Sequence, residues 1–85
     1  MITESEFIEK GAKLRRQLRE LKREHTEKVI AEKQRHKQCK DNEYELHGLN
    51  MKMLNEAYYA ENGRLMEEQT DLQREWALFK LKIEN

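Results

Sequence analysis

The sequence predicts an all-α protein, a long antiparallel helical hairpin (a coiled coil) that dimerises into a four-helix assembly. Two observations predict it: a seven-residue repeat of apolar side chains in the second half of the chain, and opposite net charges on the two halves. The composition agrees, because no proline, three glycines and 40% charged residues are typical of long helices. The 85 residues allow one domain, residues 1–85, whose small core needs association for more than marginal stability.

The first arm of the hairpin is expected over residues 4–40. Its start is a capping box, in which the Thr3 hydroxyl accepts a hydrogen bond from the backbone amide of Glu6 and Ile2 can pack on Phe7. Apolar residues then recur at spacings of three, four and seven, which is the period of one helix face. The apolar residues that we expect on this side of the hairpin seam are Phe7, Leu14, Leu18 and Leu21.

A turn is expected over residues 41–43. Asn42 followed by Glu45 makes a second capping box, so a new helix can begin here. The apolar phase also changes at this point. Leu21 and Tyr44 are 23 residues apart, two more than three heptads, so the apolar residues of the two arms cannot form one continuous stripe.

The second arm is expected over residues 44–84 and carries an unbroken heptad repeat, which we call the long stripe. Asn62-Gly63 is a possible helix terminator, but the repeat passes through it without losing phase, which favours one helix. We expect the long stripe and Trp76 to complete the hairpin seam. The long stripe consists of Tyr44, Met51, Tyr58, Leu65, Leu72 and Phe79.

Charge favours folding back at the turn. Residues 10–40 carry twelve basic and four acidic side chains, a net of +8, whereas residues 41–85 carry five and ten, a net of −5. Folding at the turn pairs positions whose numbers add to about 83, so Lys22 is expected beside Glu61. Each such exposed ion pair contributes only about 0.2–1 kcal/mol, so the pattern selects the topology more than it stabilises it.

The alternative architecture is one continuous helix in a parallel coiled-coil dimer. Asn55 and Asn62 would then occupy core positions, which favours two-stranded parallel coils. This alternative would place the basic segment of one copy against that of the other. We therefore expect the hairpin.

A second apolar stripe lies roughly opposite the long stripe on the same helix and has no evident partner within the chain. We call Leu46, Leu49, Met53, Ala57 and Ala60 the short stripe. At about 100° per residue these five side chains share one face. We expect this face, with Tyr59 at its border, to form a homodimer contact or to bind a protein partner.

The function predicted from these features is a non-enzymatic protein–protein interaction module, such as an adaptor, assembly factor, chaperone or inhibitor. No glycine-rich phosphate loop or nucleophile elbow is present, so we expect no enzyme and no cofactor. We also expect no metal, because His25, His36, Cys39 and His47 lack the paired spacing of structural zinc sites. The lone Cys39 and the absence of a long apolar run predict an intracellular, cytoplasmic protein without membrane contact.

The alternative function is nucleic-acid binding by the basic first arm. Binding of phosphates without sequence selectivity requires only a high density of Lys and Arg. We favour the simpler interpretation that the acidic arm neutralises this segment. The candidate contacts are Lys13, Arg15, Arg16, Arg19, Lys22 and Arg23.

Overall fold

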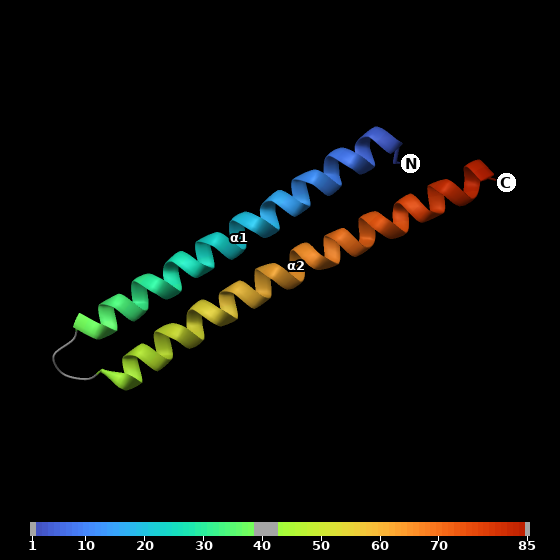
Figure 1. Cartoon of the computed structure of the whole chain (residues 1–85). Helices are drawn as coiled ribbons and strands as arrows, with labels where there is room; N and C mark the ends of the chain where they lie inside the picture. Colours follow the sequence, from blue (N-terminus) through green and yellow to red (C-terminus); the bar gives the residue numbers. More distant parts are fainter. Residues whose placement is uncertain (1, 39–42, 85) are drawn as a thin grey trace.

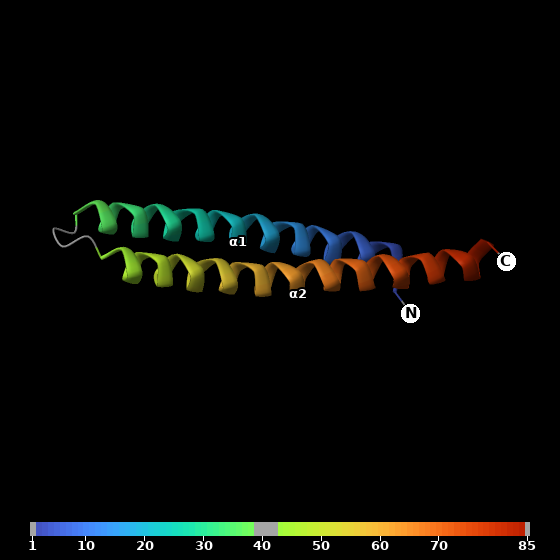
Figure 2. The ribbon, with the colours of Figure 1, turned by 90° about the horizontal axis from the view of Figure 1, so that it is seen from below.

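The structure, a computed structural model that describes residues 2–38 and 43–84, contains two long helices packed side by side in opposite directions (Figure 1). Helix α1 spans Glu4–Gln38 and helix α2 spans Tyr44–Glu84. Figure 2, a view turned by 90°, shows the same two helices side by side, so the molecule is a single layer. Its Cα atoms extend over 68 × 17 × 13 Å. The predicted helical hairpin is confirmed, and the alternative of one continuous helix is wrong.

The helix ends follow the sequence signals where the structure describes them. The amide of Glu6 donates to Oγ1 of Thr3 at 3.2 Å and the amide of Phe7 donates to the Thr3 carbonyl at 2.9 Å, so Thr3 caps α1 as predicted. At the start of α2 the amide of His47 donates to the carbonyl of Glu43 at 2.9 Å. The predicted end of the first arm at residue 40, Cys39 and the capping residue Asn42 lie outside the described residues.

The predicted register, in which facing residue numbers add to about 83, is confirmed by three pairs of stacked rings across the seam. Stacking of large rings gives both apolar burial and a geometric preference that resists slippage of one helix along the other. The pairs and their centroid separations are Phe7–Trp76 at 4.8 Å, His25–Tyr58 at 4.3 Å and His36–His47 at 4.2 Å.

The buried core sits at the open end of the hairpin, away from the turn. Its four buried apolar residues are joined by half-buried Phe7, Leu18, Leu21, Trp76 and Phe79, while Met51 and Tyr58 are half-buried farther along the seam. Nearer the turn the seam becomes polar, with His36, His47 and Glu32 between the helices. The packing of α1 against α2 is therefore strongest at one end. Among the described residues, the four buried apolar side chains are Ile2, Leu14, Leu65 and Leu72.

Tyr44 is a correction to the predicted seam, because its side chain is 67% exposed. The register places Tyr44 opposite position 39, which lies outside the described residues. Its ring meets the edge of the His36 ring, with the ring centroids 5.2 Å apart. The possible helix break at Asn62-Gly63 does not occur, since α2 is continuous through both residues.

Candidate interaction surface

The short stripe lies exposed on α2. Because α1 covers the long stripe from Met51 onward, the opposite face of α2 has no neighbour among the described residues. Leu46, Leu49 and Met53 are 44%, 53% and 60% exposed, and Ala57 and Ala60 are exposed as well. The five residues span about 21 Å of helix at a rise of about 1.5 Å per residue. They form a narrow apolar strip along the N-terminal half of α2.

Tyr59 lies between the short stripe and the seam. At about 100° per residue, it is about 80° around the helix from Leu49 and about 100° from Tyr58. Its ring is 68% exposed and meets Tyr58 edge-on, with the ring centroids 5.5 Å apart.

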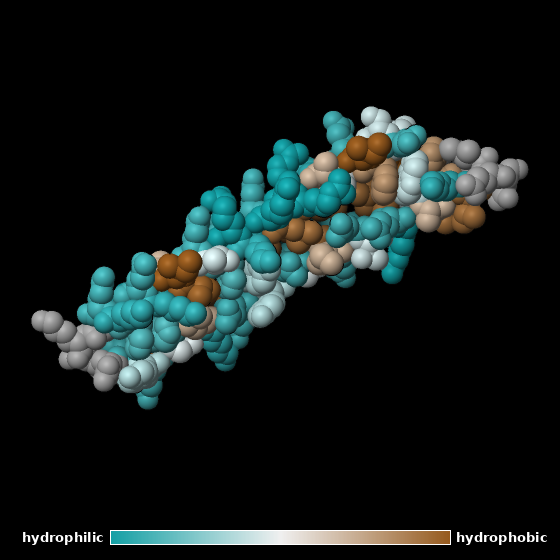
Figure 3. Space-filling model, in the orientation of Figure 1, coloured by the Kyte–Doolittle hydropathy of each residue, from teal (hydrophilic) through white to brown (hydrophobic). Residues whose placement is uncertain are grey.

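One edge of the short stripe continues into a shallow groove of about 540 Å³ between the helices. Met53, Leu54 and Ala57 line it from α2, and Ala31 lines it from α1. Lys28 and Arg35 stand at its α1 side. On the face drawn in Figure 3, hydrophobic surface occurs in separate patches among hydrophilic side chains. An apolar partner side chain that covers the short stripe could also enter this groove.

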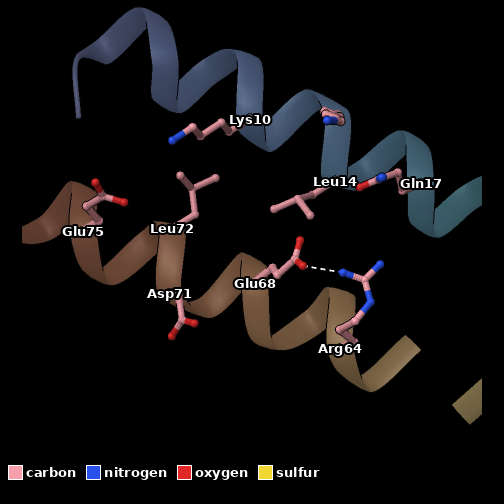
Figure 4. A pocket seen from close by; sticks show the side chains of 9 residues that line it. Lys10, Leu14, Gln17, Arg64, Glu68, Asp71, Leu72 and Glu75 are labelled. Atoms are coloured by element: carbon pink, nitrogen blue, oxygen red, sulfur yellow. Dashed lines mark hydrogen bonds and ion pairs between the residues drawn. The ribbon is translucent and has the colours of Figure 1, made fainter. Parts of the chain in front are cut away.

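A second open groove, of about 470 Å³, follows the opposite end of the seam (Figure 4). Leu14 of α1 and Leu72 of α2 point into the space between the helices, whereas Asp71 points away from α1. The rim carries both signs of charge: Lys10 on α1, and Glu68, Glu75 and Arg64 on α2. Such a mixed rim gives little selectivity for a charged ligand. This groove therefore lies along the edge of the hairpin core.

Near the turn Arg35 of α1 pairs with Glu43 at 3.3 Å, but the basic residues of α1 between positions 13 and 23 do not pair with α2 as expected. Glu61 and Glu68 both bond to Arg64 of their own helix, and Arg23 pairs with Glu27 of its own helix at 3.1 Å. Within residues 2–38 and 43–84, the other basic residues of the candidate segment make no ion pair. The predicted pairing is therefore wrong for this segment, and its cations face solvent. The exposed basic residues of this segment that make no ion pair with a described residue are Lys13, Arg15, Arg16, Arg19 and Lys22.

A polar cluster lies in the seam near the turn, centred on Glu32, whose side chain is only 10% exposed. Arg35 donates to both of its carboxylate oxygens, through Nη2 at 2.7 Å and Nε at 2.9 Å. From α2, Asn50 donates at 3.2 Å and Nδ1 of His47 lies 3.1 Å away. These hydrogen bonds, chiefly those from Arg35, lower the pKa of Glu32 to about 2. The cluster thus ties α1 to α2 where apolar packing is weak.

The ionised carboxylate of Glu32 should make the stability of the hairpin depend on pH. The pKa of Glu32 is about 2 in the folded chain against an ordinary 4.5, so its carboxylate stabilises the fold above about pH 4.5. That contribution is lost as the pH falls toward 2. We expect Glu32→Gln to lower the thermal midpoint at pH 6, and the difference from the wild type to shrink as the pH approaches 2.

The matched control for this titration is Glu24→Gln, because Glu24 is exposed and lies on α1, the helix that carries Glu32, away from the short stripe. Its thermal midpoint should follow that of the wild type at every pH. A difference between Glu32→Gln and the wild type that stays constant from pH 6 to pH 2 would show that the charge of Glu32 does not stabilise the fold.

The network around Glu32 was not predicted from the sequence. A charged side chain on a seam face is a signal that polar partners lie opposite. The described residues contain no group of three or more His, Cys, Asp or Glu side chains placed to hold a metal ion, and Cys39 lies outside them. Neither helix in the described part of the chain combines the length and the apolar character that crossing a membrane requires.

No family model, curated protein or solved structure matches this chain. We therefore infer its function from the surface of the chain itself.

Proposed function

We propose that this chain is a non-enzymatic protein–protein interaction module that presents the short stripe of α2 to a second copy or to another protein. The observation that carries the proposal is that α2 has two apolar stripes and α1 covers only one of them. Three large apolar side chains, Leu46, Leu49 and Met53, stand together on the uncovered face. Burial of such surface contributes about 25 cal/mol per Å², enough to drive association when several side chains are covered together.

The uneven core supports the same proposal. Among the described residues, the four buried apolar side chains lie within residues 2–14 and 65–72, whereas nearer the turn the seam contains the polar side chains of Glu32, His36 and His47. The short stripe, residues 46–60, lies on that weaker half. A partner that covers it would add apolar burial where the chain itself has least. Association would thus stabilise the part of the hairpin that α1 alone holds loosely.

The test is the double substitution Leu49→Asp and Met53→Asp. Both side chains are more than half exposed, so helix content measured by circular dichroism should be retained. Analytical ultracentrifugation should show that self-association is lost, and capture of protein partners from the source cell should be lost with it. If the double variant keeps both the mass and the partners of the wild type, the short stripe is not the interaction surface.

The matched control replaces a methionine and a leucine elsewhere on the same helix. Met66 and Leu78 are 48% and 63% exposed and lie beyond the short stripe. Met66→Asp with Leu78→Asp introduces the same charges into α2 and should leave association intact. Loss of association in this variant would mean that added negative charge, and not loss of the short stripe, causes the effect.

Nucleic-acid binding is the second candidate function, favoured by the unpaired cations of α1. Lys13, Arg15, Arg16, Arg19 and Lys22 are exposed, and a face of this kind attracts phosphates in a salt-dependent way. Nuclease treatment before the capture experiment separates the two candidates. Partners that survive the treatment support the interaction module, whereas partners lost with the nucleic acid support the second candidate.

A further inference from the structure

The short stripe is symmetric in spacing about Met53. Its residues follow one another at intervals of three, four, four and three, so the stripe reads the same in both directions along α2. Its side chains are not symmetric in size. Two leucines lie on one side of Met53 and two alanines lie on the other. A stripe of this kind fits a copy of itself that runs in the opposite direction.

We infer that the occupant of the short stripe is a second copy of this chain, with the two α2 helices antiparallel and crossing at Met53. This inference rests on the proposed function and specifies its partner. Positions whose numbers add to 106 then lie level, so Leu49 faces Ala57 of the second copy and Leu46 faces Ala60. Each leucine fills the space above an alanine, which gives the interdigitation that close packing requires. A parallel pair would place leucine on leucine and alanine on alanine, with a gap at one end.

The length of the stripe is also explained. Helix α2 begins at Tyr44, and in this register Tyr44 lies level with residue 62 of the second copy. The two helices therefore overlap over residues 44–62 of each, and the short stripe, residues 46–60, fills that overlap. Arg64, Glu67 and Asp71 replace apolar residues on this face beyond the point where the second helix ends. The resulting assembly has two α2 helices at its centre and an α1 helix on each outer side.

Disulfide cross-linking tests the arrangement, with Cys39→Ser in every variant. Residue 53 lies on the two-fold axis, so the Met53→Cys chain should run at twice its mass on a non-reducing gel after mild oxidation. Leu46→Cys and Ala60→Cys should each remain single chains when oxidised alone. A mixture of the two should form the cross-linked pair, because an antiparallel dimer places residue 46 of one copy against residue 60 of the other.

A parallel dimer would cross-link Leu46→Cys and Ala60→Cys each with itself and would overturn the inference. Sedimentation of the uncross-linked chain separates the remaining outcomes. A dimeric mass without cross-linking of Met53→Cys would overturn the antiparallel geometry but leave the interaction module in place. A monomeric mass at every concentration would overturn the second copy as occupant, and the proposed function would then depend on capture of a different protein by the same stripe.

Discussion

Leu65→Ala should lower the free energy of unfolding by about 2–5 kcal/mol, the usual cost of removing a buried leucine side chain and leaving a cavity. Leu65 is only 2% exposed and belongs to the cluster that joins α1 to α2. Small domains are stable by roughly 5–15 kcal/mol in total, so this loss is a large share. Urea denaturation followed by circular dichroism measures it.

Leu81→Ala is the control for Leu65→Ala. Leu81 lies on the same helix, but its side chain is 57% exposed, so its removal should change stability by no more than about 0.5 kcal/mol. Equal losses in the two variants would contradict the seam described above. A Leu65→Ala chain that keeps its helices but no longer associates would show that the long stripe, and not the short one, contacts the partner.

The second large effect is expected at the open end of the hairpin. Ile2 is 1% exposed, although it precedes the first helical residue, and it closes the core beside Phe7. Ile2→Ala should cost about 2 kcal/mol or more, because the site loses apolar burial and gains a cavity. Phe7 stacks on Trp76, the sole tryptophan of the chain, so tryptophan fluorescence reports on this end directly. Its emission should shift to the red as the end opens to water.

Ile8→Ala provides the comparison for Ile2→Ala. Ile8 is 58% exposed, so the emission of Trp76 and the denaturation midpoint should stay close to those of the wild type. If Ile2→Ala leaves both measurements unchanged, Ile2 does not close the core and the N-terminal residues contribute nothing to the seam.

Much of the fold could be predicted because local and long-range signals agree. The Thr3 capping box marks the start of α1, and the heptads show which face of α2 is buried. Opposite net charges favour an antiparallel return, and the stacking of Phe7 on Trp76 confirms the register that follows. The exposed position of the short stripe followed from the same geometry, since one helix can cover only one face of its neighbour.

The individual ion pairs could not be predicted, because a charged side chain such as Glu61 has several possible partners of opposite charge. Glu61 was assigned to Lys22 across the seam, but Arg64 lies three residues away on the same helix and reaches it with less loss of conformational freedom. The net charge of each arm does not show whether Glu61 pairs with Lys22 or with Arg64. Tyr44 was placed in the seam by its heptad position, which indicates a helix face but does not show that a side chain at the first residue of the helix is covered.

The central claim is that the chain folds back on itself, so that α1 covers the long stripe and leaves the short stripe for a partner. The most direct test is the distance between spin labels at Arg16 and Glu67, two exposed positions whose numbers add to 83. The Cys39→Ser background is used, and excess unlabelled chain removes distances between copies. Packed helix axes lie about 8–10 Å apart, so the hairpin predicts a short distance. A separation of about 75 Å, the length of 51 residues of continuous helix, would contradict it.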